Sequence, residues 1–402
     1  MPSSFLGFLA HGLLQTGWGG LALYLLVATQ LTIFSVTLYL HRSMAHRGVD
    51  FHPVVAHMFR FWTWLTTSMV TREWVAIHRK HHAKCETEED PHSPMQKGIK
   101  TVFWRGVELY REARSQRDDM EKYGKGCPDD WIERHLYTPH ATMGPTLLLF
   151  ISFALFGFAG VAVWAIQMLW IPLWAAGVVN GLGHWWGYRN FVTDDTATNL
   201  TPWGLWIGGE ELHNNHHAFP SSAKFALRKW ELDIGWGAIR LFEAFGLAKV
   251  LRVAPSLDVR PNISVPDADT LKALLAIRFQ AMTDFQRDVL KPALREEASA
   301  AGARLRALLP RKLRKGLTDD GRWLQPDAQQ QLQSWVAQRP RIRTLVEHRA
   351  RLAAVLEARS NSASETLHNL QAWCHEAEAS GNRALQEFSA RLKGYSLRTM
   401  HA

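Results

Sequence analysis

The amino-acid sequence predicts an all-α integral membrane protein with a soluble helical region at its C-terminal end. Two uncharged apolar runs carry the membrane part of this prediction, because residues 17–40 and 141–183 contain no Asp, Glu, Lys or Arg. About 20 apolar residues cross the core of a bilayer, so the second run is long enough for two crossings. Residues 266–402 instead carry Ala, Leu, Arg and Glu at helical spacing between proline-containing breaks, which is typical of soluble amphipathic helices.

The N-terminal segments are interpreted in chain order. Residues 3–18 are apolar but short, which leaves a partial helix, an interfacial segment and a compressed first crossing as alternatives. Residues 17–40 are predicted to span the membrane. Residues 51–70 are rich in aromatic side chains, but His57 and Arg60 interrupt them. This pattern favours a helix that lies along the membrane surface.

The long apolar run predicts a transmembrane hairpin. Its two helices are expected at about 141–159 and 161–183, with the break near the small residues at 157–160. A hairpin returns the chain to the same face of the membrane, so residues 1–260 are predicted to form one membrane domain with a helical cap on that face. The many Lys and Arg near the span ends predict that the cap is cytoplasmic.

The basic charge of the chain is partly located in the C-terminal extension. The whole sequence has 46 Lys plus Arg and 37 Asp plus Glu, a formal net charge of +9. A basic helical extension at residues 266–402 can bind anionic lipid, nucleic acid or a redox partner. Solvated helix faces explain the same pattern more simply, so no nucleic-acid partner is predicted and the role of the extension stays open.

Histidines gather in four short clusters within the first 217 residues. These clusters contain nine of the 19 histidines, together with one asparagine. The residues are His41 and His46; His78, His81 and His82; Asn180 and His184; and His213, His216 and His217. One H-x-x-H-H box in a basic stretch can be a charged surface run. Two identical boxes beside two further pairs, at the ends of apolar segments, favour a metal site.

Helix geometry explains the spacing of the boxes. An α-helix advances about 100° per residue, so the three histidines of each H-x-x-H-H box share an arc of roughly 100°. Asn180 and His184 are four residues apart and also face the same way. His41 and His46 diverge by about 140° on an ideal helix. They would reach one metal only if the helix ended between them, and could more easily serve two metals.

The number and type of the ligands indicate the chemistry. Nine imidazoles are too many for one ion, and neutral imidazole suits iron, copper, nickel or zinc. A structural zinc site would need four ligands in a compact module. We therefore expect a dinuclear iron centre that activates dioxygen, and the membrane location indicates a lipid-like substrate. The non-enzymatic alternative is a metal-binding or transport protein, which would carry its ligands along a pathway within the spans.

The cluster sequences resemble the membrane-bound fatty acid desaturases. The resemblance runs from about residue 38 to residue 236, and within the family it is to the Δ9 acyl-chain desaturases, which include animal stearoyl-CoA desaturases and bacterial relatives. It is carried by HRSMAHR, by HRKHH with DPHSP following, by NGLGHWWGYR and by GEELHNNHHAFP.

This resemblance implies a di-iron, O2-dependent enzyme that places a cis double bond, at Δ9, into a saturated acyl chain. The nine histidines become ligands of two iron ions, Asn180 reaches one iron through a water, and no catalytic residue is expected beyond these ligands. Trp74 becomes a tunnel-wall residue, with an interfacial aromatic anchor as its alternative. The sequence has no His-Pro-Gly-Gly haem motif, so the expected electron source is a separate ferredoxin- or cytochrome-type donor with its reductase.

The substrate carrier and the supporting carboxylates are less defined. Acyl-CoA is the first expected carrier, followed by a phospholipid acyl chain, but Ala76 stands where animal enzymes have an arginine that holds the CoA group. A related lipid or alkane hydroxylase is the alternative activity. Carboxylates are expected to orient the ligating imidazoles, and the candidates near the boxes are Glu73, Asp90, Glu210 and Glu211.

Overall fold

The computed structural model describes residues 5–302, 304–358 and 362–398, which form two compact units. The N-terminal unit comprises Met1–Arg189 and Asp195–Ala254, and the C-terminal unit comprises Asn190–Asp194 and Pro255–Ala402. Each unit has its own core, and each is described by itself below.

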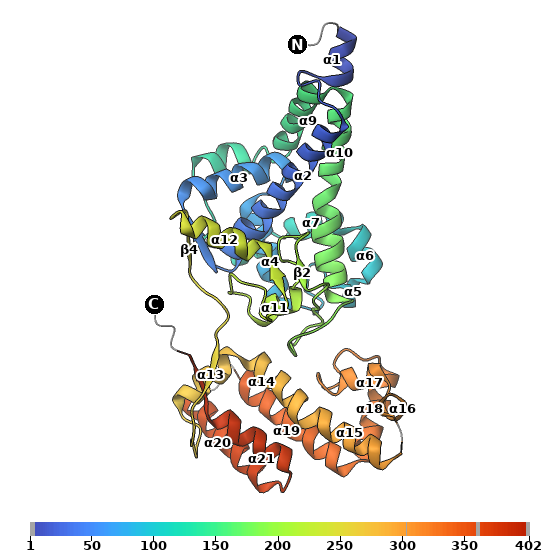
Figure 1. Cartoon of the computed structure of the whole chain (residues 1–402), viewed down its shortest axis with the longest axis vertical. Helices are drawn as coiled ribbons and strands as arrows, with labels where there is room; N and C mark the ends of the chain where they lie inside the picture. Colours follow the sequence, from blue (N-terminus) through green and yellow to red (C-terminus); the bar gives the residue numbers. More distant parts are fainter. Residues whose placement is uncertain (1–4, 303, 359–361, 399–402) are drawn as a thin grey trace. The chain divides into compact units, whose positions relative to one another are not determined.

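The N-terminal unit is mainly helical, and several of its helices contain π-helical turns (Figure 1). Its helices are α1 (Phe5–His11), α2 (Trp18–Phe34), η1 (Ser35–Ala45), α3 (Pro53–Thr67), α4 (Thr71–Lys84), α5 (Pro94–Lys97), α6 (Ile99–Trp104), α7 (Gly106–Arg114), α8 (Arg117–Tyr123), η2 (Glu133–Tyr137), α9 (Met143–Phe156), α10 (Phe158–Ile171), η3 (Pro172–Gly181), η4 (Leu182–His184), α11 (His213–Ala218) and α12 (Ile234–Ala244). Strand β1 (Val49–Phe51) pairs antiparallel with β4 (Ala248–Val250), and β2 (Trp203–Gly204) pairs parallel with β3 (Leu232–Asp233).

The first long helix continues beyond the predicted span. Helices α2 and η1 form one uninterrupted helix, Trp18–Ala45, of 28 residues. The prediction ended this helix at residue 40, where the uncharged run ends, but the buried Arg42 is accommodated by partners from other segments and the helix continues. Of the preceding apolar stretch, residues 5–11 form α1 and residues 3 and 4 lie outside the described part of the chain.

The helices α9 and α10 form a hairpin that lies beside α2 (Figure 1). The break falls at Gly157, whose positive φ of 64° favours glycine. A Cβ atom on Gly160 would lie 2.0 Å from the Ser152 carbonyl oxygen, so glycine lets the two backbones approach closely. Helix α10 continues through η3 and η4 as Phe158–His184, 27 residues long.

Among the residues that the structure describes, two helices are long and apolar enough to cross a membrane by length and composition, Trp18–Ala45 and Phe158–His184. Helix α9 has 14 residues, fewer than the roughly 20 needed to cross the bilayer core. The first arm of the hairpin is therefore shorter than the expected 141–159. Helix α3, which falls in the expected interfacial segment, spans 15 residues and ends at Ser68 with a left-handed φ of 60°.

Hydrogen bonds and a buried ion pair hold the histidine-bearing segments together. The Arg79 side chain of α4 donates to the carbonyl oxygens of Met44 (2.7 Å) and Ala45 (3.0 Å), at the end of η1. The buried Arg42 guanidinium donates to both carboxylate oxygens of Asp233, at 3.0 Å each, and lies 3.8 Å from the ring centroid of Phe225. These contacts fix α4 and the loop before α12 against η1.

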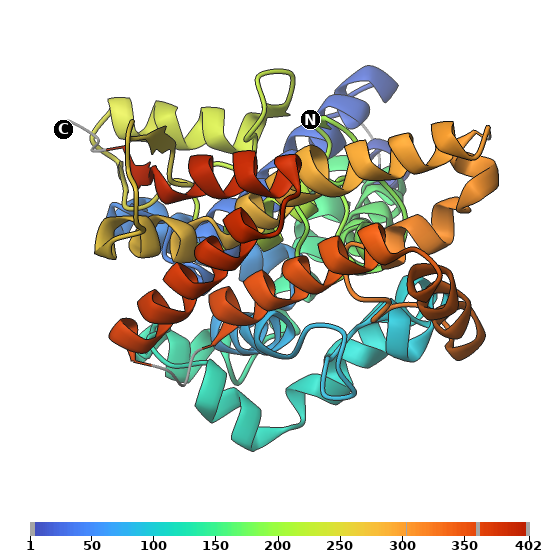
Figure 2. The ribbon, with the colours of Figure 1, turned by 90° about the horizontal axis from the view of Figure 1, so that it is seen from below.

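The C-terminal unit is a set of packed amphipathic helices (Figure 2). They are α13 (Ala268–Ala276), α14 (Arg278–Phe285), η5 (Gln286–Leu290), α15 (Lys291–Ala300), α16 (Leu305–Leu308), α17 (Arg311–Gly316), α18 (Pro326–Ala337), α19 (Pro340–Glu357), α20 (Ala363–Ala379) and α21 (Arg383–Lys393), with strand β5 (Leu257–Val259) antiparallel to β6 (Tyr395–Leu397). Helix α20 packs against α19 and α21, and the rings of Phe285 and Phe388 meet edge to face at 5.1 Å in the core.

Candidate metal centre

The first histidine pair lies on a π-helical segment. The His46 N–H donates to the His41 carbonyl oxygen at 3.1 Å, a hydrogen bond between residues five apart. In this geometry residues five apart come close to the same face, and the two ring centroids are 5.0 Å apart. The divergence of about 140° that an ideal α-helix would give them is therefore absent, because the segment is not an α-helix.

The two H-x-x-H-H boxes lie on helices that face each other. The first box is on α4 and the second forms most of α11, and His81 and His217 have ring centroids 5.3 Å apart. His184 stands at the end of the long helix from Phe158, in η4. The structure thus brings all nine predicted histidines into one region.

The nitrogens form two neighbouring groups. The ligand atoms of the first group all lie within 4.8 Å of one another, and its members are His41, His46, His78, His82 and His216. Its shortest separations join the Nε2 atoms of His46 and His78 (2.8 Å) and those of His82 and His216 (2.9 Å).

The second group contains the other four imidazoles. His81, His184 and His217 lie within the same limit of one another, together with Cys85. His213 joins them, because its Nε2 lies 3.0 Å from that of His184. Each box is therefore divided between the groups. In the first box, His81 belongs to the second group and its two neighbours belong to the first. In the second box, His216 belongs to the first group and its two neighbours belong to the second.

Two of the four expected carboxylates contact ligating histidines. Asp90 accepts from His81 Nδ1 at 3.0 Å, and Glu210 accepts from His41 Nδ1 at 2.7 Å. The other two candidate carboxylates contact groups other than the histidines. Glu73 pairs with Arg114 at 3.6 Å, and Glu211 accepts from the backbone N–H groups of residues 206, 207 and 209.

Sequence reasoning missed two further carboxylates. Glu86 accepts from His184 Nδ1 at 3.0 Å, and Asp195 accepts from His217 Nδ1 at 2.7 Å. Glu86 lies in the acidic run after the second cluster, which was a usable signal. Asp195 had no such signal, because it lies 22 residues before its partner.

The protonation of the cluster fits metal binding. Burial, followed by the charge of neighbouring imidazoles, holds the pKa values of His46, His78, His82, His213 and His216 well below the usual range, and burial lowers that of His217 to about 4 against the opposing effect of Asp195. These rings are therefore neutral at pH 7. The four carboxylates accept Nδ1–H groups, which leaves the Nε2 lone pairs of their partners directed to the centre.

A bound cation would account for the short separations between the imidazole nitrogens. The Nε2 of His216 lies 3.0 Å from that of His41 and 2.9 Å from that of His82, and a single ring nitrogen carries at most one proton. The buried His217 Nε2 has no hydrogen-bond partner among the described residues. Nine imidazoles in two groups fit two nitrogen-preferring transition-metal ions.

Two further side chains lie beside the centre. Cys85 Sγ is 3.9 Å from His81 Nε2, and burial and the nearby carboxylates raise the pKa of its thiol well above the usual value. His92 stacks on His81 with ring centroids 4.3 Å apart, and its Nε2 is buried without a partner among the described residues.

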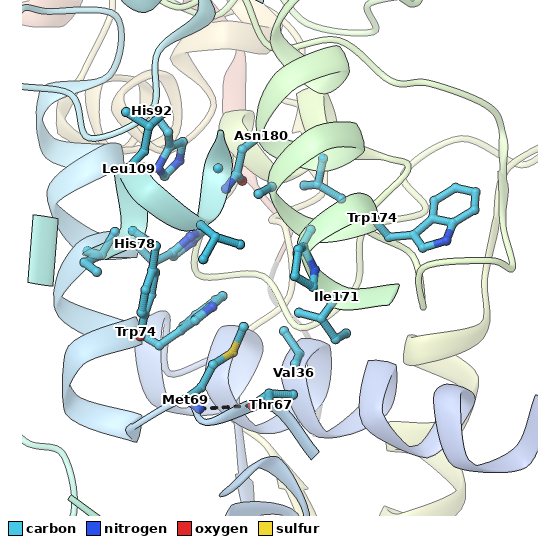
Figure 3. A pocket seen from close by; sticks show the side chains of 18 of the residues that line it. Val36, Thr67, Met69, Trp74, His78, His92, Leu109, Ile171, Trp174 and Asn180 are labelled. Carbon is cyan, nitrogen blue, oxygen red and sulfur yellow. Dashed lines mark hydrogen bonds between the residues drawn. The ribbon is translucent and has the colours of Figure 1, made fainter. Parts of the chain in front are cut away.

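A largely apolar cavity of about 580 Å3 opens onto the histidines. His41, His78, His213 and Asn180 belong to its lining. Trp74 also lines it, and its ring is stacked on that of His78 with centroids 4.9 Å apart (Figure 3).

The cavity is elongated beyond the histidines. In Figure 3 the lining residues Val36, Thr67 and Met69 lie at one end of the view, and His92 and Asn180 lie at the other. The predicted tunnel residue Trp74 and the predicted Asn180 are thus both on the wall of a cavity that reaches the metal ligands.

Comparisons with known proteins agree with this arrangement. The model of the fatty acid desaturase family matches residues 16–236, more than half of the chain. A probable chloroplastic lipid desaturase of Arabidopsis thaliana is 34% identical over 219 residues, which cover 53% of this chain and 58% of the relative. An sn-2 palmitoyl-lipid 9-desaturase of Nostoc is 31% identical over 255 residues, 59% of this chain and 83% of the relative.

A relative whose name specifies an acyl-CoA substrate has a similar sequence identity. An icosanoyl-CoA 5-desaturase of Limnanthes douglasii is 31% identical over 225 residues, 54% of this chain and 60% of the relative. All four histidine clusters lie inside the matched region, and the family is membrane-associated and oxidoreductive. The chain therefore belongs to the fatty acid desaturase family.

Proposed function

We propose that the protein is an O2-dependent acyl desaturase that introduces a cis double bond, at Δ9, into a saturated acyl chain. The observation that carries this proposal is the cavity of about 580 Å3 that joins an apolar wall to nine converging imidazoles. An acyl chain in that cavity would pass the Nε2 atoms that hold the metals. A metal-transport pathway would not need a large apolar cavity beside its ligands.

The residues would hold two iron ions, one in each histidine group. When bound, the iron centre supplies the oxidising power to remove two hydrogens from adjacent carbons. In the balanced reaction, the chain gives two hydrogens, a donor gives two electrons, two protons are taken up, and O2 leaves as two waters. The four carboxylates would keep their partner imidazoles in the ligating tautomer, and Asn180, which lines the same cavity as His213, would hold a water beside one iron.

The chain's own side chains would position the substrate. Trp74 forms a flat wall against His78, so an acyl chain that follows this wall is held beside the metals. Ile33, Val36 and Met69 continue the apolar surface beyond it. The apolar lining also excludes water from the reacting carbons.

We propose a membrane-lipid acyl chain as the substrate carrier, in place of the acyl-CoA first expected. Two of the relatives described above are named for lipid-bound chains. Ala76 is fully buried and holds no charge, so this position does not bind a CoA phosphate. Acyl-CoA is the second candidate, favoured by the CoA-named relative and by Arg111 on the cavity lining.

The electron donor is proposed to be a separate ferredoxin- or cytochrome-type protein with its reductase. The basic sequence, with a net charge of +9, suits an acidic donor. We also propose that the histidine centre faces the cytoplasm at the inner membrane of a bacterium, because Lys and Arg cluster near the ends of the apolar helices.

The proposal is tested by the fatty-acid profile of a desaturase-deficient host that expresses the protein. Gas chromatography with mass spectrometry of double-bond derivatives should detect new cis-Δ9 monounsaturated chains. These should vanish with His216→Ala, which removes a buried ligand, and persist with the matched His135→Ala, which changes an exposed histidine outside both groups.

The same experiment separates the alternatives. A pulse of labelled saturated fatty acid should give the first unsaturated product in the phospholipid pool, whereas first appearance in acyl-CoA would move the carrier assignment. Hydroxylated lipid would indicate a hydroxylase. Iron-loaded protein with a supplied donor and no lipid product would overturn the enzymatic proposal.

A further inference from the structure

A second cavity, of about 410 Å3, lies entirely within the C-terminal unit. One wall is the helical stretch from α14 through η5 to α15, and the other is formed by α16, α17 and the two residues after α17, Leu317 and Thr318. The volume lies in the range of small-molecule sites, which is about 300–1,000 Å3. None of the residues that line it takes part in the histidine centre.

The floor of this cavity is apolar. It is formed by four leucines, Leu290, Leu294, Leu305 and Leu317. Three of them are buried, with exposed fractions of 1% for Leu290, 7% for Leu294 and 2% for Leu317. A hydrocarbon chain would fill a cavity with this apolar floor, whereas a small inorganic anion would find no polar partner on it.

The rim of the cavity is cationic. Lys291 and Arg314 line it, and neither forms an ion pair with any residue in the described part of the chain. Arg314 Nε is buried and has no hydrogen-bond partner among the described residues. A buried N–H without a partner is costly. The third cation, Arg287, is already paired with two carboxylates.

The residues that line the cavity favour a negatively charged ligand. The residues that line the cavity include no Asp or Glu. Arginine binds carboxylate and phosphate through two parallel N–H groups, and a lysine beside it adds a second positive charge. Both cations face the same cavity as the leucines, so one ligand can satisfy the rim and cover the floor.

We propose that this cavity binds an anionic amphiphile, a single acyl chain with a carboxylate or phosphate head. The chain lies on the four leucines, and the head lies between Lys291 and Arg314. This inference is independent of the proposed function, because it rests on residues of the C-terminal unit alone. It gives the extension a ligand-binding role that its basic, amphipathic sequence leaves open.

The test uses photo-crosslinking on the purified full-length protein in detergent micelles. Three probes with the same diazirine-bearing sixteen-carbon chain are compared: a fatty acid, a lysophosphatidate and a fatty alcohol. Peptide mass spectrometry should locate crosslinks of at least one anionic probe at residues 283–294 and 305–318. The neutral alcohol should label these peptides about tenfold less. Labelling by one anionic probe only would identify the head group.

Charge variants make the test specific. K291E/R314E should lower the labelling of the cavity at least about tenfold, since it removes both unpaired cations. R295E/K312E is the matched control, because it makes the same charge change on α15 and α17 at exposed residues that do not line the cavity. Labelling near Trp74 in the other unit serves as an internal reference.

Folding is checked by thermal unfolding, and K291Q/R314Q replaces the reversal if that variant does not fold. The proposal is overturned if neither anionic probe labels the cavity, or if the alcohol labels it equally. It is also overturned if K291E/R314E has no effect, or if R295E/K312E has the same effect.

Discussion

Replacing Glu210 with Gln should weaken iron binding without unfolding the protein. Glu210 is buried, and its Oε1 accepts from His41 Nδ1 at 2.7 Å and from Thr37 Oγ1 at 2.5 Å. The carboxylate keeps the proton on Nδ1, so the Nε2 lone pair faces the metals. Gln retains an acceptor oxygen but loses the charge.

The size of the effect follows from the hydrogen bond. A hydrogen bond to a charged group contributes about 1.5–3 kcal/mol, and a neutral one contributes about 1 kcal/mol. The difference of roughly 0.5–2 kcal/mol corresponds to about 2- to 30-fold in affinity. This range overlaps the 10–100-fold loss typical when a group behind a metal ligand is removed.

The assay is a competitive titration of the iron-loaded protein with a chelator, followed by metal analysis. Glu211→Gln is the matched control, because Glu211 is an adjacent buried carboxylate that accepts only backbone N–H groups. It should lower the thermal stability and leave the iron affinity within about twofold. Equal losses of iron affinity in the two variants would refute the assigned role of Glu210.

Three further predictions follow from buried groups and from the cavity. Arg42→Met leaves the buried Asp233 carboxylate with only backbone N–H donors and should cost about 3–5 kcal/mol of unfolding free energy in chemical denaturation, a loss that the double variant Arg42→Met/Asp233→Asn should partly recover, because it removes the charge and keeps an acceptor at the start of α12. Met69→Trp fills one end of the cavity and should shift the products toward shorter chains, as measured by gas chromatography. Burial raises the pKa of the Cys374 thiol to about 11, so its contribution to stability is present below the ordinary pKa and is lost as pH rises from about 9 to about 11. Between pH 8 and pH 10.5, the fall in the free energy of unfolding should be smaller in Cys374→Ala than in the unchanged protein, because the other thiols with raised pKa values remain in both.

The sequence was informative where local geometry determines the outcome. The spacing H-x-x-H-H places three imidazoles on one stripe of any α-helix, and both boxes are helical here. The small residues near the middle of the long apolar run indicated a break, and the helix turns at Gly157. The membership of the chain in the fatty acid desaturase family was likewise visible in the cluster motifs.

The sequence was less informative where distant segments decide the geometry. The angle between His41 and His46 was expected from 100° per residue, but the π-helical turn changes it, and such turns depend on tertiary contacts. The pairing of Glu86 with His184 joins residues 98 positions apart. The cavity of the C-terminal unit was also invisible, because leucines that line a cavity have the same helical spacing as leucines in a core.

The division of each histidine box between the two groups has a consequence for assembly. His78 and His82 on α4 belong to the first group and His81 to the second, while on α11 His216 belongs to the first and the pair His213 and His217 lies with the second. Neither group can therefore be completed by one helix. Two metals, one in each group, would need α4 and α11 docked face to face, so metal binding and the packing of these helices would stabilise each other. A sequence with only one of the boxes would have the right residues and still lack a complete site for either ion.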